Sequence, residues 1–255
     1  MLGYIGHNII VVSNHVASLC AFARRLLRLP FDKNRDGRAI VRIIMVEQMY
    51  FTGVQSLPIL IPTALVFGTA MIIQFAAVSG QYDLGKLILI LIVRELGPMV
   101  TALILILRSA TAVTIEISYM QVLHEIEALE MSGIDPLRII GLPRLAGITF
   151  SVLCLFILFD LFALAGGYLI VLTVTPLPVG NLPSQLANAV TATDIAVGMV
   201  KALCFGVTIT SVALYHGFRS KQSITQIPVV TSRAAIESFF YCLLANFFIS
   251  FIFYY

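Results

Sequence analysis

The sequence has little charge and no tryptophan. Only 11% of its 255 residues are charged, whereas a soluble domain carries about 25%. Hydrophobic residues make up 59% of the chain and its mean hydropathy is +0.99, so no long polar stretch is left from which to build a soluble domain. The formal net charge of +3 is too small to indicate nucleic acid as a partner. The composition therefore excludes a soluble globular protein and predicts an all-α integral membrane protein.

Cysteine is also scarce, and its spacing indicates no cysteine chemistry. The four cysteines are scattered along the chain at Cys20, Cys154, Cys204 and Cys242. None forms a C-x-x-C pair, so neither a zinc motif nor a thiol redox motif is supported.

Two enzyme motifs begin in this sequence, but neither is complete. Residues 80–86 match the spacing G-x-x-x-x-G-K, but Leu87 stands where a P-loop needs Ser or Thr. His124-Glu125 begins an H-E-x-x-H pattern, but Ala128 stands where the second histidine is needed. We therefore expect no catalytic residue, no bound metal and no cofactor on this chain.

Apolar runs of roughly 20 residues or more predict five transmembrane helices, because such a run crosses a hydrocarbon core of about 30 Å. The predicted spans run over about 54–78, 86–108, 147–172, 195–216 and 236–254. Residues 5–29 repeat apolar side chains at helical spacing between polar ones, which is typical of an amphipathic helix lying in the membrane interface. A further helix, about 39–53, leads to the first span, and we expect Gly53 and Pro58 to bend its entry. The chain thus divides into an N-terminal region, 1–53, and a five-span domain, 54–255.

The basic residues lie mainly on one side of this topology. That side carries the N-terminal region, the connection between the second and third spans, and the connection between the fourth and fifth spans. Its lysines and arginines include Arg24, Arg25, Arg28, Lys33, Arg35, Arg38, Arg42, Arg138, Arg144, Arg219, Lys221 and Arg233. The other side has only Lys86, with no Lys or Arg in 173–194. The positive-inside rule places the N-terminus in the cytoplasm and the C-terminus outside.

Arg94 and Glu95 are charged residues inside the second apolar run. A charge at mid-bilayer costs roughly 2.5–3.5 kcal/mol on insertion scales, so such residues usually face a cavity or a partner. Two interpretations stay open, a structural pair near the outer end of the span and a polar lining for a substrate cavity, and we favour the second. Gly97-Pro98 follows directly and is expected to loosen the helix.

Asp160 in the third span and Lys201 in the fourth are isolated intramembrane charges. We expect them to pair across helices, chiefly for structural reasons. Small residues at four-residue spacing in the same spans permit close helix packing. They are Ala163 with Gly167 and Ala202 with Gly206.

The segment 118–136 combines acidic residues with an apolar stripe. Gly133 is a natural helix stop, and Asp135-Pro136 starts a new turn. The segment is either a solvated loop or a short helix that docks in a groove of another protein. A transporter chain that has no P-loop of its own and is driven by a separate ATPase needs such an element, because ATP hydrolysis in the ATPase can move the transporter only through a direct mechanical contact.

The run RELGPMVTALILILRSATAVTIEISYMQVLHEIEALEMSGIDPLRIIGLPRLAG, which begins at Arg94, resembles the signature region of the MlaE (YrbE-like) permeases of bacterial lipid-transport ABC systems. The resemblance covers roughly residues 40–220. Outside the run it includes the segments Gly53–Ile59, Gly166–Tyr168, Lys201–Leu203 and Tyr215–Gly217 and the residues Gln74 and Asp160.

This resemblance implies an assembly in the bacterial inner membrane. The family's permease is a homodimer with an interfacial N-terminal helix and five spans in each chain. It sits between a cytoplasmic ABC ATPase pair, which binds ATP and Mg²⁺, and a periplasmic ring of MCE-domain proteins, and a small accessory cytoplasmic subunit is among the expected partners. The assembly moves phospholipids between the inner membrane and the ring and supports outer-membrane lipid asymmetry.

The resemblance also implies roles for particular residues. Arg94, Glu95, Gly97 and Pro98 would line the lipid cavity. The segment of about 118–136 would be the coupling helix that docks in the ATPase, through His124, Glu125, Glu127, Leu129, Glu130, Gly133 and Asp135.

The sequence departs from the family pattern in places. The usual E-Q-I-D-A-L-E is H-E-I-E-A-L-E here, over residues 124–130, and Asn246 stands where many members have Asp. The function we predict is the permease subunit of an ABC-type phospholipid transporter. The alternatives are a secondary transporter or channel, driven by an ion gradient through the charges at Arg94, Glu95, Asp160 and Lys201, and a scaffold that only anchors the MCE ring.

Overall fold

The described part of the chain is helical throughout. The computed structural model describes residues 2–29, 38–78, 90–174, 192–220 and 223–254. Among these residues no strand occurs, which confirms the predicted all-α class. The motif at 80–86, the predicted start of the second span and most of the 173–194 loop lie outside these ranges.

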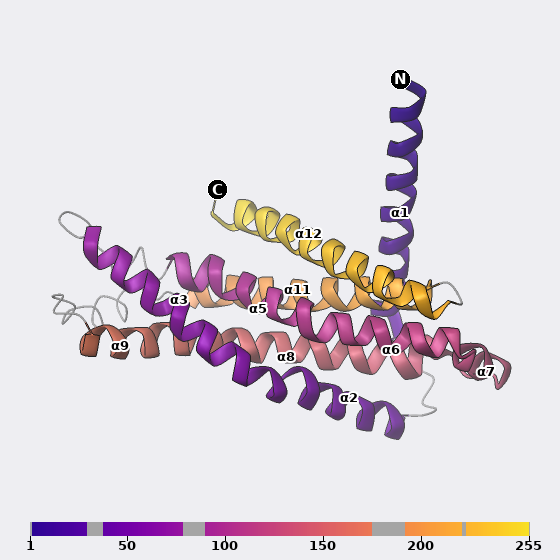
Figure 1. Ribbon diagram of the computed structural model, residues 1–255, viewed down its shortest axis with the longest axis horizontal. Coiled ribbons are helices and arrows are strands. Elements are labelled where there is room, and N and C mark those ends of the chain that lie inside the picture. Colours follow the sequence, from indigo (N-terminus) through magenta and orange to yellow (C-terminus); the bar gives the residue numbers. More distant parts are fainter. Residues whose placement is uncertain (1, 30–37, 79–89, 175–191, 221–222, 255) are drawn as a thin grey trace.

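Within the described ranges, five helical stretches are long and apolar enough to cross a membrane, as the hydropathy of the sequence predicts. They run over Ala39–Gln74, Ile92–Val122, Leu137–Ile170, Thr193–Phe218 and Ile224–Phe253. They lie side by side along the long axis of the molecule (Figure 1).

Most of these helices are longer than the apolar runs that predicted them. The first takes in the separately predicted 39–53 helix, and the fifth begins at Ile224 rather than at 236. The second span continues past residue 108 to Val122, and the third begins at Leu137 rather than at 147. The prediction stopped where charged residues interrupt the apolar run. The helices continue there because these charges have partners, such as Glu116, whose Oε1 accepts a 2.6 Å hydrogen bond from buried Arg144.

Both long spans contain wider, π-helical turns between their α-helical parts. The second span consists of η3 (Ile90–Leu96), α5 (Gly97–Leu105), η4 (Ile106–Ala110) and α6 (Thr111–Val122). The third consists of η5 (Leu137–Gly141), α8 (Leu142–Leu161), η6 (Phe162–Gly166) and α9 (Gly167–Val174). Turns of this kind are rare and occur frequently at functional sites.

The N-terminal helix α1 (Leu2–Arg28) stands across the long axis of the bundle and meets it near one end (Figure 1). The next helix, α2 (Arg38–Thr52), is followed by one 3₁₀ turn, η2 (Val54–Ser56), and then by α3 (Leu57–Val78). The predicted bend at Gly53 is therefore where the α-helical path is interrupted.

Arg108 of η4 fastens this interruption to the second span. Its Nη1 donates to the Phe51 carbonyl and to Ser56 Oγ, both at 2.6 Å, and its guanidinium lies 4.7 Å from the centre of the Phe51 ring. The Arg108 charge, at which the predicted span ended, thus has hydrogen-bond acceptors at the junction between α2 and α3.

Small residues allow two close helix crossings, as predicted. A Cβ atom on Gly68 of α3 would lie 1.9 Å from the carbonyl oxygen of Ala163, and one on Gly167 would lie 2.7 Å from the carbonyl carbon of Gly68. A Cβ atom on Gly206 would lie 2.7 Å from Thr149 Cα. Backbone meets backbone at these points, so the spans approach more closely than larger side chains permit.

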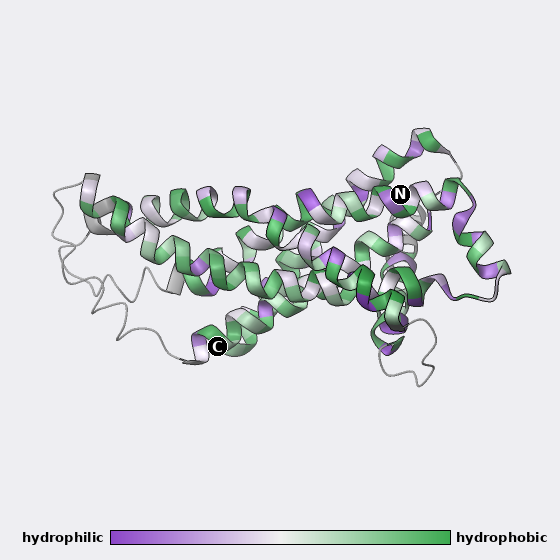
Figure 2. Ribbon diagram, turned by 90° about the horizontal axis from the view of Figure 1, so that it is seen from below, coloured by the Kyte–Doolittle hydropathy of each residue, from purple (hydrophilic) through white to green (hydrophobic). Residues whose placement is uncertain are grey.

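The last two spans are α11 (Ala192–Phe218) and α12 (Ile227–Tyr254), joined through η7 (Ile224–Gln226). The inner face of α12 packs on α11, α5 and α6, while its outer face leaves a row of large apolar side chains exposed, namely Phe240, Phe247, Phe248, Phe251 and Ile252. Hydrophobic colour dominates the middle of the molecule, and hydrophilic residues gather toward the end that carries the N-terminal helix (Figure 2).

Candidate functional site

Arg94 and Glu95 lie in η3, directly before Gly97-Pro98. In a regular helix the N–H of residue 98 would donate to the carbonyl of residue 94, but proline has no N–H. The carbonyl oxygen of Arg94 instead accepts a hydrogen bond from Lys201 Nζ at 2.7 Å. The proline thus frees an acceptor that a lysine of α11 uses, and the two spans are joined at the predicted polar site.

Glu95 is the centre of a network that joins three spans. Its Oε1 accepts from Lys201 Nζ at 2.9 Å and from Ser250 Oγ at 2.8 Å, and its Oε2 accepts from Asn246 Nδ2 at 2.8 Å. Lys201 is fully buried, whereas 38% of the Glu95 side chain is exposed. The carboxylate therefore neutralises a buried cation on one side while its other side stays accessible.

Arg94 turns to a different partner. It forms an ion pair with Asp194 near the start of α11, where Asp194 is buried. Adjacent helical residues point about 100° apart, so Arg94 and Glu95 reach separate groups on α11 and α12 rather than each other. Among the described residues, the cluster thus contains the two ion pairs Arg94–Asp194 and Lys201–Glu95.

The predicted pair of Asp160 with Lys201 is wrong. Lys201 pairs with Glu95, and no ion pair among the described residues joins it to Asp160. Asp160 instead lies against the second span, where a Cβ atom on Gly97 would come within 2.1 Å of its Oδ1. That buried Oδ1 atom has no hydrogen-bond partner among the described residues. The four predicted cavity residues and both intramembrane charges therefore belong to one region, but the pairing differs.

Asp194, Asn246 and Ser250 are parts of this cluster that the sequence interpretation left out. Asn246 and Ser250 are four residues apart on α12, which places them on one face of the helix. Two polar residues at that spacing in an apolar run are the signal that points to them. Asn246, noted only as a departure from the family pattern, is a hydrogen-bond donor to Glu95.

The predicted docking segment forms a short, separate helix at the end of the second span. After α6, His124 adopts the left-handed conformation with φ of 59°, and α7 runs over Glu125–Met131. Gly133, with φ of 76°, follows its end, and Asp135 Oδ1 accepts from the backbone N–H of Leu137 at 3.1 Å to start the third span. The predicted stop at Gly133 and restart at Asp135 are confirmed.

The two faces of α7 differ. Ile126 is buried and Leu129 packs on the core, whereas Glu125, Glu130 and Met131 are exposed, Met131 by 88%. Near the start of the helix, His124 Nδ1 lies 2.9 Å from Glu127 Oε2. The helix is thus anchored through its apolar side and presents acidic residues around an exposed methionine.

Comparison with known proteins gives one consistent family. The model of the family described as Permease MlaE matches residues 45–252. The intermembrane phospholipid transport system permease protein MlaE of Haemophilus influenzae is 34% identical over 200 residues, 76% of this chain and 77% of that protein. Probable ABC transporter permease proteins of Rickettsia conorii and of Synechocystis are each 27% identical, over 222 residues (83% of both chains) and 211 residues (80% of both chains).

Proposed function

The chain belongs to the MlaE permease family, and we propose that it is the permease subunit of an ABC transporter that moves phospholipids between the bacterial inner membrane and a periplasmic ring of MCE-domain proteins. Phospholipid as cargo is supported by the likeness to the Haemophilus influenzae protein, whose name describes intermembrane phospholipid transport. The consequence for the cell is maintenance of outer-membrane lipid asymmetry.

The observation that carries this proposal is the continuous helix from Ile92 to Val122. One end bears the Glu95 network and the other leads through His124 into α7. Its 31 residues correspond to about 46 Å at 1.5 Å per residue, which exceeds a hydrocarbon core of about 30 Å. A displacement of α7 would therefore be transmitted along one helical rod to the polar cluster.

We propose that α7 is the coupling helix. Its exposed acidic residues dock in a groove of the cytoplasmic ATPase, which binds ATP and Mg²⁺ and does the hydrolysis, so this chain is not itself an enzyme. The left-handed residue His124 and the turn at Gly133 set α7 apart from the two spans, which suits an element that is moved as a unit. A small accessory subunit would act on the same cytoplasmic face.

The lipid cavity would lie at the interface of a homodimer, with Arg94, Glu95, Gly97 and Pro98 in its wall. The exposed aromatic face of α12 and the half-exposed Glu95 side chain would both face it. A lipid phosphate competes with carboxylates for cations because Arg and Lys hydrogen-bond to both. A lipid headgroup would thus displace Asp194 from Arg94, or Glu95 from Lys201. The acyl chains would then contact the exposed aromatic face of α12.

The distribution of basic residues supports an orientation with the N-terminus and α7 in the cytoplasm and the C-terminus in the periplasm.

The pairing of the intramembrane charges also bears on the alternative function, an ion-driven carrier or channel. Because Arg94 and Lys201 each pair with a carboxylate, the cluster fits a joint between spans better than a path for ions.

The test uses the full transporter, reconstituted in liposomes with its ATPase and MCE partners. We expect Glu130→Lys to abolish ATP-driven phospholipid transfer without affecting membrane insertion. The matched control is Gln226→Lys, which adds a charge at an exposed position of η7. Wild-type transfer in Glu130→Lys would refute the coupling role of α7.

The cavity is tested separately with Arg94→Ala and Glu95→Ala. We expect both variants to lose some stability, because each breaks an ion pair of the cluster, but still to co-purify with the partners. We expect both to lose most transfer activity, because each removes a charge from the proposed headgroup site. Normal transfer in both would leave these residues with a purely structural role.

A further inference from the structure

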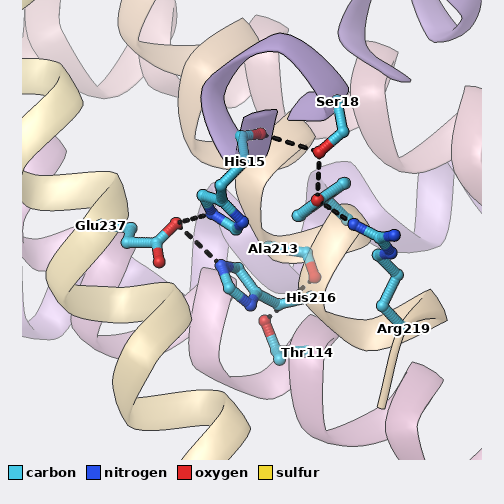
Figure 3. Close-up of polar contacts among 8 residues, drawn as sticks. His15, Ser18, Thr114, Ala213, His216, Arg219 and Glu237 are labelled. Carbon is cyan, nitrogen blue, oxygen red and sulfur yellow. Dashed lines mark hydrogen bonds and ion pairs between the residues drawn. The ribbon is translucent and has the colours of Figure 1, made fainter. Parts of the chain in front are cut away.

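Three side chains that are far apart in the sequence converge where α1 meets the bundle. His15 of α1, His216 of α11 and Glu237 of α12 point toward one another (Figure 3). His15 Nε2 lies 3.0 Å and His216 Nε2 lies 2.9 Å from the same oxygen, Glu237 Oε2. These three atoms all lie within 4.8 Å of one another.

Two imidazole nitrogens and a carboxylate oxygen are a zinc ligand set. Catalytic and other open zinc sites use three protein ligands of this kind and leave a fourth position for water. At bond lengths of about 2.0–2.1 Å, the ligand atoms of a tetrahedral site are about 3.3 Å apart. The observed 2.9 and 3.0 Å contacts therefore need to widen by only a few tenths of an ångström to admit an ion.

The surroundings hold the two imidazoles in place. Both rings pack on buried Tyr215, with ring centroids 5.4 Å (His15) and 5.5 Å (His216) from the tyrosine ring. Tyr215 Oη in turn lies 2.6 Å from Ser18 Oγ and accepts a hydrogen bond from Arg219. Ligands that are oriented before the metal arrives lose less freedom on binding.

The cluster opens on a groove of about 990 Å³, which gives an ion and its water access to the fourth position. Arg219 and Arg233 also line this groove. Cations held mainly by electrostatic attraction to oxygen atoms, such as Ca²⁺ and Mg²⁺, are disfavoured beside two arginines and two imidazoles. Zn²⁺ is favoured because imidazole nitrogen is among its preferred ligands.

We propose that His15, His216 and Glu237 form a Zn²⁺ site that clamps the N-terminal helix to the fourth and fifth spans. The scattered cysteines and the incomplete H-E-x-x-H pattern gave no reason to expect a metal, because these three ligands share no local motif. The site is independent of the proposed transport function, since it uses none of the residues of the Glu95 cluster or of α7.

The first test measures zinc on the full-length chain. The protein is purified in detergent without a polyhistidine tag, incubated with Zn²⁺, desalted and analysed by inductively coupled plasma mass spectrometry. We expect one zinc ion per chain in the wild type and an affinity at least about tenfold lower in His216→Ala and Glu237→Gln. The matched control, His124→Ala, removes a histidine that also contacts a glutamate and should bind as the wild type does.

Two results would overturn the proposal, namely background zinc on the wild type or an equal loss in His124→Ala. A second measurement uses only the wild-type chain and does not depend on the variants folding. Co²⁺ replacing Zn²⁺ should give the intense visible absorption of a tetrahedral site, which excess Zn²⁺ removes. An octahedral spectrum, or none, would contradict the site.

Discussion

Replacing Lys201 by methionine should destabilise the protein through Glu95. Lys201 is fully buried and donates to Glu95 Oε1 and to the Arg94 carbonyl. Removing one partner of a fully buried ion pair costs about 3–5 kcal/mol. Glu95 is 38% exposed and keeps its bonds from Asn246 and Ser250, so we expect a smaller loss, about 2 kcal/mol, in the free energy of unfolding.

The charge left behind is the main cause of this cost, so removing it should recover part of the stability. Glu95→Gln in the Lys201→Met background leaves no unpaired carboxylate, and the amide still accepts from Ser250. We expect the two substitutions to be coupled by about 1–2 kcal/mol, within the range for residues in direct contact.

The assay is unfolding of the purified chain by SDS in mixed micelles, followed by circular dichroism. As a control, Lys201→Met is combined with Glu130→Gln, an exposed acid beyond the opposite end of the long second helix. That pair should be additive. If Lys201→Met and Glu95→Gln were also additive within about 0.5 kcal/mol, the ion pair would not join the spans as described.

Two further changes test the packing and the turn before α7. Gly68→Ala should lower the free energy of unfolding by about 1–3 kcal/mol, because its Cβ would lie 1.9 Å from a backbone oxygen of Ala163. Gly141→Ala, whose Cβ would meet only side-chain atoms, the nearest being Leu26 Cδ1 at 3.0 Å, should cost clearly less in the same unfolding assay, and equal costs would contradict the close crossing. His124→Val should be less stable than His124→Gly by about 1 kcal/mol or more in that assay, because position 124 has φ of 59°. Equal stability of the two variants would show that this conformation is not required.

Hydropathy was enough to predict the five spans, because an apolar run of sufficient length has few alternatives to a transmembrane helix. It did not give the end of the second span or the starts of the third and fifth spans. There, helical residues carry charges such as Arg108 and Arg144, which are satisfied by groups distant in the sequence, and a sliding average of hydropathy contains no information on such partners.

The sequence predicted which residues form the candidate site better than it predicted the contacts between them. Arg94 and Glu95 were identifiable because charges in an apolar run are rare. The partner of Lys201 was not, because Asp160 and Glu95 are both acids within neighbouring spans and only the packing decides between them. The cluster of His15, His216 and Glu237 could not be predicted from the sequence for the same reason, since 222 residues separate His15 from Glu237.

The most direct test of the proposed function is phospholipid transfer by the purified complex in liposomes. The permease is reconstituted with its ATPase and MCE partners, and labelled phospholipid is followed with and without ATP. The account predicts transfer that requires ATP and the ATPase subunit. Transport by the permease alone under an ion gradient, with no ATP-dependent movement of lipid, would contradict it.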